Sequence, residues 1–380
     1  MNKEDLKAIF LIILMLGLIA ILIILGVSIY SRFTGNDENI LEVFEEGYTA
    51  ILNKNENQKP SSVIIEENSQ LDQVESANKQ TQSESDQSNT EKTDDNYFYN
   101  QLNSYSKMIY DELEKNKENM KSGTYKIDFG DSFSELLKRE NGEDLLKDYY
   151  QSAIETYLYD NPEVFYLEPT KMYINIRTIK KVFTTTYEVY IDSGKEANYL
   201  SEECNTKQQV LAYENRIEEE ANKILSQIEK GTEYQKILMI HDYLVNNVSF
   251  EESLSKNNIY NMYGALVNKE AVCEGYAKAF KYLMDKIEVE CVVVIGMATN
   301  SKGETQNHAW NYMNLDNKWY AIDVTWDDPI VIGHGYVGND IKYRYFLKGS
   351  TTIDKDHFKE TQFTEGGQEY NYPQLSLNDY

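Results

Sequence analysis

The sequence has few of the residues on which fibrous and disulfide-stapled proteins depend. It contains 19 glycines, 5 prolines and 3 cysteines among 380 residues, which excludes a collagen helix and a disulfide scaffold. No heptad pattern continues over several turns, so a coiled coil is excluded as well. The cysteines include no closely spaced pair, which argues against a redox protein.

Positive charge is scarce too. Only 37 lysines and arginines stand against 63 aspartates and glutamates, and the formal net charge at pH 7 is −26. Such a surface would repel a polyanion, so we expect no nucleic acid as a partner. The sequence also lacks the H-E-x-x-H, C-x-x-C and acidic calcium-loop patterns. We therefore expect no metal and no cofactor.

A long apolar run lies close to the N-terminus. Ala8 to Tyr30 contains no charged residue, and at ~1.5 Å per residue a helix of this length exceeds the ~30 Å thickness of the bilayer hydrocarbon. The apolar part of a cleaved signal peptide is shorter, ~7–15 residues, which favours an uncleaved anchor in the lipid bilayer. Lys3 and Lys7 precede the run and Arg32 follows it. The positive-inside bias then predicts a single-pass cell-membrane protein with a cytoplasmic N-terminus and an extracellular body.

The stretch after the anchor is acidic and polar, with few aromatic residues. It cannot bury enough apolar surface to offset the entropy lost on ordering, so we expect a disordered tether. At ~100–200 residues per domain, the rest of the chain is long enough for two folded units. The predicted organisation is a cytoplasmic stub and transmembrane anchor at 1–31, a disordered linker at 32–96, a small α+β unit at 97–201 and a last domain at 202–380.

Hydrophobic periodicity predicts the main elements. Segments with apolar residues at helical spacing are expected at 97–120, 145–159, 208–230 and 233–247. Segments rich in Tyr, Ile, Val and Thr are expected to form strands at 164–167, 172–179 and 182–191.

Cys273 stands directly before a segment whose apolar residues follow helical spacing as far as Ile287. A thiol at the start of a helix lies at the positive end of the backbone dipole, which favours the reactive thiolate. A cysteine can equally be a small buried hydrophobic residue. We expect neither Cys204, in a polar stretch, nor Cys291, inside an apolar strand, to be catalytic.

Residues 307–326 are predicted to form two β-strands around Asp316 and Asn317, a dipeptide that tolerates the positive φ angles of a tight hairpin. If these two residues are the loop, His308 and Asp323 lie on the same face as diagonal neighbours, roughly 7–8 Å apart. A three-residue loop would put them on opposite faces. A carboxylate beside a histidine fixes its tautomer and stabilises its cation, as a base that serves a cysteine requires.

Cysteine, histidine and aspartate in this order are compatible with a catalytic triad, although a lone histidine in a strand is more often structural. Segments 263–267, 272–277, 307–311 and 319–329 read Tyr-Gly-Ala-Leu-Val, Val-Cys-Glu-Gly-Tyr-Ala, Asn-His-Ala-Trp-Asn and Trp-Tyr-Ala-Ile-Asp-Val-Thr-Trp-Asp-Asp-Pro. Together they resemble the core of the transglutaminase-like superfamily, in its bacterial surface-protein branch.

The resemblance implies an α+β protein whose last domain has a papain-like fold. In that fold the nucleophile opens a helix that packs on an antiparallel sheet carrying the other two residues of the triad. By similarity Cys273 is the nucleophile, His308 the general base and acid, and Asp323 the residue that orients His308. The backbone N–H of Cys273 is a natural oxyanion donor.

Two tyrosines and two histidines have less certain roles. Tyr260 and Tyr263 are candidates for a side-chain oxyanion donor, but a place in the core or at its rim is favoured for both. His241 lies on a predicted helix, where a structural role is expected. His357 stands alone in loop-like sequence.

The sequence thus predicts a membrane-anchored, surface-exposed cysteine enzyme that acts on amide bonds through a thioester acyl-enzyme. Its partner would be a protein or peptide substrate. Hydrolysis of a protein or cell-wall peptide by a cysteine peptidase is favoured. Deamidation, cross-linking by an amine acceptor, and a non-catalytic surface binding or scaffold module remain alternatives, because the acceptor is selected by pocket shape and water exclusion.

Overall fold

The computed structural model describes residues 65–68, 96–180, 183–228, 230–328, 339–360, 362–363 and 366–380, all within one compact unit, Leu52–Tyr380. The anchor expected at Ala8 to Tyr30 lies outside these residues. Within the described ranges, no helix is long and apolar enough to cross a bilayer. Most of the predicted linker also lies outside them, except strand β1 (Ile65–Asn68), which pairs in parallel with β3 (Tyr173–Lys180).

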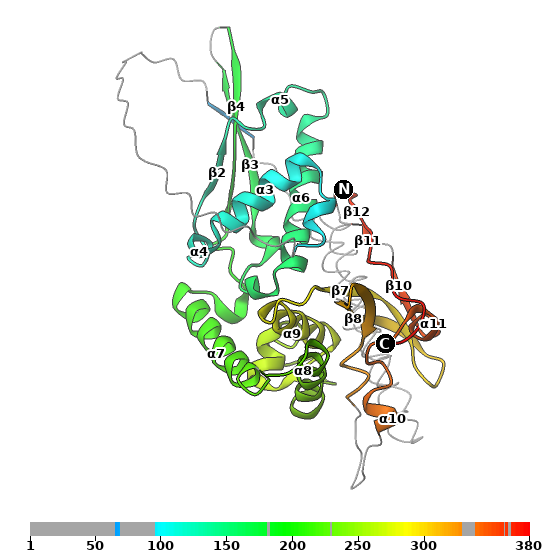
Figure 1. Cartoon of the computed structure of the whole chain (residues 1–380). Coiled ribbons are helices and arrows are strands. Elements are labelled where there is room, and N and C mark those ends of the chain that lie inside the picture. Colours follow the sequence, from blue (N-terminus) through cyan, green and yellow to red (C-terminus); the bar gives the residue numbers. More distant parts are fainter. Residues whose placement is uncertain are drawn as a thin grey trace, which may run out of the picture. The chain divides into compact units, whose positions relative to one another are not determined.

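The first part of the described chain is a small α+β unit. Its sheet has the order β1-β3-β4-β2, and helices α3 and α6 pack against each other beside it (Figure 1). The remaining elements of this part are β2 (Ile127–Gly130), β4 (Thr185–Asp192), α3 (Ser104–Lys115), α4 (Lys117–Met120), α5 (Ser134–Leu137) and α6 (Gly142–Asp160). One apolar cluster fills it, from Leu102 to Val210.

Two predictions for this unit differ from the structure. The helix expected over 97–120 begins only at Ser104, because the side chain of Asn103 accepts the N–H groups of the first turn. The strand expected at 164–167 is wrong. Pro162, with its fixed φ, opens a 3-10 turn there instead, Pro162–Val164.

The second part contains three long helices and a four-stranded sheet of order β10-β7-β8-β9. Helix α9 lies against β7 and β8 (Figure 1). The main elements are α7 (Lys207–Leu225), α8 (Glu233–Asn247), α9 (Cys273–Lys286), β7 (Cys291–Thr299), β8 (Thr305–Leu315), β9 (Lys318–Ile322) and β10 (His357–Lys359). Smaller elements are β5 (Ser249–Phe250), β6 (Glu270–Ala271), a π-helical turn (Gly264–Asn268), α10 (Asn339–Lys342), α11 (Ser350–Ile353), β11 (Gln362–Phe363) and β12 (Glu369–Tyr370).

The hairpin register agrees with the prediction. Asp316 and Asn317 form a two-residue loop with φ angles of 54° and 59°, and Leu315 pairs with Lys318. Both positive φ values suit the tight turn that joins right-handed twisted strands. The register places His308 and Asp323 on one face.

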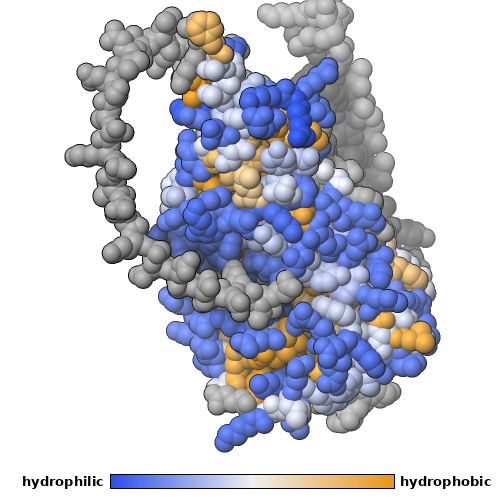
Figure 2. Space-filling model, turned by 45° about the horizontal axis from the view of Figure 1, so that its top comes forward, coloured by the Kyte–Doolittle hydropathy of each residue, from blue (hydrophilic) through white to orange (hydrophobic). Residues whose placement is uncertain are grey.

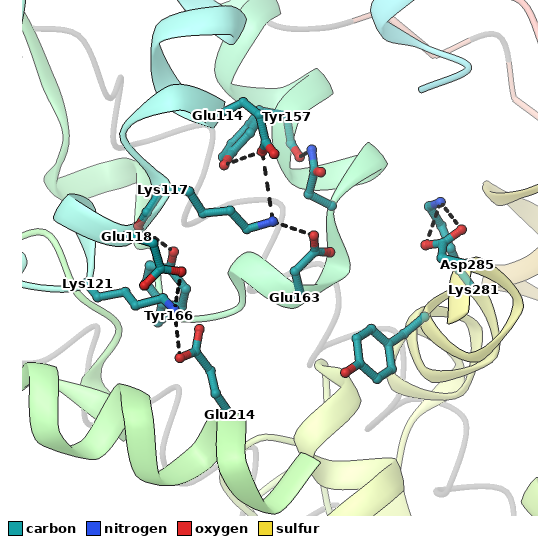
Figure 3. Close-up of polar contacts among 12 residues, drawn as sticks. Glu114, Lys117, Glu118, Lys121, Tyr157, Glu163, Tyr166, Glu214, Lys281 and Asp285 are labelled. Atoms are coloured by element: carbon teal, nitrogen blue, oxygen red, sulfur yellow. Dashed lines mark hydrogen bonds and ion pairs between the residues drawn. The ribbon is translucent and has the colours of Figure 1, made fainter. Parts of the chain in front are cut away.

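An ion pair joins the two parts. Lys121, at the end of α4, contacts Glu214 of α7 at 2.9 Å and Glu118 of its own helix at 2.6 Å (Figure 3). Within the α+β unit, Lys117 contacts Glu163 at 2.5 Å. The face shown in Figure 2 is mostly hydrophilic, as the net charge leads one to expect.

Asp160, at the end of α6, is a buried carboxyl group at this junction. It accepts hydrogen bonds from the N–H groups of Phe98 and Tyr99. Burial raises the pKa of Asp160 to about 7, although Lys281 and these N–H groups partly offset the effect. The protonated form is therefore the one that the fold favours.

We expect the free energy of unfolding to fall as pH rises from about 4 to about 7. Over that window the unfolded Asp160 ionises from its ordinary pKa of 3.8, while the folded one keeps its proton. The loss from this group alone should approach roughly 4 kcal/mol. Urea unfolding at pH ~4 and ~8 measures it. Asp160→Asn should flatten the dependence, and the exposed Asp131→Asn should not; parallel curves for Asp160→Asn and the wild type would contradict the assignment.

Candidate active site

Cys273 is the first residue of α9 and is partly exposed. It packs against a small apolar cluster that contains Ala277 and Val293. The preceding residue, Val272, donates its N–H to the carbonyl of Ile259 at 3.0 Å. The loop that contains Ile259 is thereby fixed against the start of α9.

Gly275 allows that close approach. A Cβ atom at this position would lie 2.3 Å from the carbonyl oxygen of Ile259 and 2.9 Å from the Cβ of Ala271. A backbone oxygen cannot move aside as a flexible side chain can. The glycine in the Cys-Glu-Gly segment is therefore a packing requirement of the site.

Gly275→Ala is expected to destabilise the protein by about 1–3 kcal/mol, because the added methyl group displaces the loop at Ile259. The same displacement should slow alkylation of Cys273. Urea unfolding and the rate of iodoacetamide labelling measure the two effects. Gly231→Ala is the matched control, since its Cβ would come no closer than 3.2 Å to a side-chain atom. Equal effects of the two substitutions would show that the loop contact is unimportant.

His308 on β8 and Asp323, the residue after β9, form a buried pair. Nε2 of His308 lies 2.7 Å from Oδ2 of Asp323, and the two residues are 2% and 0% exposed. The other carboxylate oxygen of Asp323 accepts the N–H groups of Thr325 and Trp326 at 3.0 and 3.1 Å. The contact expected from the hairpin register is present, and a turn made by the next residues fixes its carboxylate.

Cys273 interacts with the same imidazole. Burial by itself would lower the pKa of His308, but the Asp323 carboxylate, followed by the Cys273 side chain, outweighs it and raises the pKa. Burial would likewise raise the pKa of Asp323, yet His308 and His357 outweigh it and hold the pKa below its usual value. The site thus favours a charged imidazolium–carboxylate pair beside the sulfur.

His357 is a third member of the cluster that the sequence analysis missed. It lies in strand β10 rather than in a loop, with its backbone paired to Ala298 of β7. Its Nε2 lies 3.0 Å from Oδ2 of Asp323, and its Nδ1 lies 2.8 Å from Oδ1 of Asp356. No short sequence spacing links His357 to His308 or Asp323. Only the pairing of β10 with β7 brings it there.

The ligand atoms of His308, Asp323 and His357 lie within 4.8 Å of one another, so these buried groups could hold a metal ion. Hydrogen bonds among the three already satisfy them. The expectation of no metal stays a prediction.

The chain resembles known proteins over this region. Residues 222–324 match the family model of the transglutaminase-like superfamily. The chain contains a transglutaminase-like core domain. Human kyphoscoliosis peptidase is 22% identical over 148 residues, 35% of this chain and 22% of that protein. The mouse protein of the same name is 28% identical over 101 residues, 24% and 15% of the respective chains. The chain thus spans less than a quarter of the length of these relatives.

A solved structure described as that of a TGase covers 46% of this chain and 49% of its own. Its sequence identity is 14% and its TM-score 0.29. His357 and Asp356 lie beyond residue 324, where the family match ends.

A second histidine–carboxylate pair supports the transglutaminase-like core. His241 of α8 lies 3.0 Å from Oδ2 of Asp327, and both are fully buried. The other oxygen of Asp327 accepts the N–H of Tyr345 at 2.8 Å. Tyr276 of α9 donates its hydroxyl to Asp328 at 2.6 Å. These contacts anchor the turn after Asp323 to α8 and α9, which is the structural role expected for His241.

The two tyrosines considered as oxyanion donors differ in their surroundings. The hydroxyl of Tyr263 accepts a hydrogen bond from Arg216 at 2.5 Å, and its ring stacks on Tyr213 at 4.0 Å. Tyr263 therefore belongs to the helix packing. The pKa of Tyr260 is raised by burial and by the charges of Glu274 and Cys273. A role for Tyr260 as an oxyanion donor stays a prediction.

A charged cavity of about 990 Å³ lies away from Cys273. Its lining includes Tyr282 and Lys286 at the opposite end of α9, and Lys117 and Lys121 of the α+β unit. Figure 3 shows three lysines of this cavity, Lys117, Lys121 and Lys281, paired with carboxylates. The cavity is a feature of the junction between the two parts and not of the candidate active site.

Proposed function

We propose that this protein is a membrane-anchored, surface-exposed cysteine enzyme that hydrolyses amide bonds in a protein or cell-wall peptide. The observation that carries the proposal is the buried His308–Asp323 hydrogen bond, at 2.7 Å, beside a cysteine that opens a helix. Nucleophilic catalysis by cysteine requires a thiol beside an imidazole that a carboxylate orients. The match to the transglutaminase-like superfamily supports the same chemistry.

The reaction follows from the atoms that face one another. Nε2 of His308 is bonded to Asp323, which leaves Nδ1 to serve Cys273. The thiolate sulfur forms a bond to the carbonyl carbon, and an electron pair moves onto the oxygen. His308 then donates its Nδ1 proton to the leaving nitrogen as the carbon–nitrogen bond breaks, and a thioester remains. Water, deprotonated by His308, attacks the thioester, which releases the acid and restores Cys273.

Incubating the full-length protein in detergent with casein and a labelled primary amine tests the acceptor. Casein fragments, together with no labelled amine in high-molecular-weight product, would support hydrolysis. Incorporated amine or cross-linked casein would support the alternative, a transglutaminase. Neither product, with Cys273 no more reactive towards a thiol probe than Cys204 and Cys291, would leave a surface binding module.

Membrane anchoring is part of the proposal, supported by the uncharged run Ala8 to Tyr30. The full-length chain should sediment with membranes and resist extraction by carbonate. A chain that begins at Tyr97 should not, and recovery of the full-length chain in the soluble fraction would remove the anchor from the proposal.

A further inference from the structure

We propose that His357 is a positioning residue for the Cys273–His308 pair, acting through Asp323. The inference rests on the proposed function and adds to it a residue beyond the family match. His357 does not touch the sulfur. It holds the carboxylate that holds His308.

Asp323 receives hydrogen bonds on both oxygens. Nε2 of His308 and Nε2 of His357 converge on Oδ2, at 2.7 and 3.0 Å. Oδ1 accepts two backbone N–H groups of the following turn. Four donors therefore fix the plane of the carboxylate, and His357 is the donor that shares an oxygen with His308. Its loss would free Oδ2 to shift away from the position that aligns the imidazole with Cys273.

His357 is held by carboxylates on both sides of its ring. Both ring nitrogens face carboxylate oxygens, those of Asp323 and Asp356. Asp356 is itself fixed, because Tyr345 donates its hydroxyl to the second oxygen at 2.9 Å.

Aromatic rings enclose the imidazole of His357. Its ring centroid lies 4.8 Å from that of Trp326, 4.9 Å from that of Tyr345 and 5.1 Å from that of Trp310. Packed among these rings, His357 is only 2% exposed. The rings and the Asp356 contact together hold the imidazole in one orientation.

Two substitutions at position 357 differ in whether they keep the hydrogen-bond donor that faces Asp323. Glutamine places an N–H donor where Nε2 of histidine stands, whereas leucine has none. If His357 positions Asp323, His357→Gln should behave nearly as the wild type and His357→Leu should not.

The test is the pH dependence of Cys273 alkylation by iodoacetamide in the full-length protein, followed by peptide mass spectrometry. This readout needs no substrate. His357→Leu should slow alkylation about tenfold at pH ~6 and shift the pH midpoint to higher pH, because His308 no longer supports the thiolate. His357→Gln should stay within about twofold of the wild type. Phe358→Ala, at the exposed neighbouring position of β10, should have no effect.

Asp356→Asn provides a second variant should His357→Leu fail to fold, since it loosens His357 without leaving a cavity. It should show a smaller shift in the same direction. A wild-type profile for a folded His357→Leu, or for Asp356→Asn where His357→Leu is unfolded, would overturn the inference. So would a His357→Gln profile as impaired as that of leucine. His308→Ala separates this failure from that of the proposed function: if Cys273 alkylation does not depend on His308, the triad itself is wrong.

Discussion

Cys273→Ala is expected to abolish amide-bond chemistry while leaving the fold intact. In the proposed reaction this thiol forms the covalent intermediate, and loss of a nucleophile lowers kcat by on the order of 10⁶-fold. The side chain is partly exposed and packs against a small apolar cluster, so its removal should change the free energy of unfolding by less than about 1 kcal/mol. Release of casein peptides and circular dichroism of the full-length protein measure the two quantities.

Cys204→Ala is the control for this substitution. Cys204 is fully buried in the α+β unit, where it contacts Ser201, and it should be dispensable for activity. Full turnover by Cys273→Ala, or equal inactivation by the two substitutions, would end the proposal that Cys273 is the nucleophile.

The hairpin shows how far sequence reasoning reaches into the site. A two-residue loop of Asp316 and Asn317 fixes the register, and the register fixes which side chains share a face. The contact between His308 and Asp323 could therefore be predicted from local chemistry. Cys273 could be placed at a helix start by the same kind of argument, since apolar spacing defines the helix that follows.

His357 could not be found in this way. Its neighbours in sequence form a strand of three residues, too short to show an alternating pattern. Its place in the site depends on the pairing of β10 with β7, a contact between segments far apart in the chain. The error at 164–167 has another origin, because the apolar and aromatic sequence Val-Phe-Tyr-Leu suits a strand while Pro162 favours a turn.

Two buried aspartates in one turn each bond to a buried histidine, and the proposed function assigns a role in catalysis to Asp323 alone. Asp323 holds His308 and His357, whereas Asp327 holds His241 and the backbone of Tyr345. Each offsets the desolvation free energy of a buried histidine, because each presents a charged acceptor to a ring nitrogen. Only the first pair reaches Cys273. The two positions therefore offer a direct comparison between a functional and a structural carboxylate.

Asp323→Ala is expected to lower both activity and stability. Two buried imidazoles lose their shared acceptor, which should reduce the free energy of unfolding by about 3–5 kcal/mol. His308 also loses the partner that sets its tautomer, and activity should fall on the order of 10⁴-fold while a weak residue remains. Urea unfolding and peptide release, measured at a temperature where the variant is folded, test both effects.

Asp327→Ala is the matched control, because Asp327 is equally buried and also bonded to a histidine. Its stability loss should be similar, since His241 is left without its buried acceptor. Its activity per folded molecule should fall far less, because no atom of Asp327 contacts His308 or Cys273 in the hydrogen-bond pattern of the site. Equal activity losses in the two variants would mean that Asp323 acts only by holding the turn, and the orienting role would pass from Asp323 to the turn as a whole.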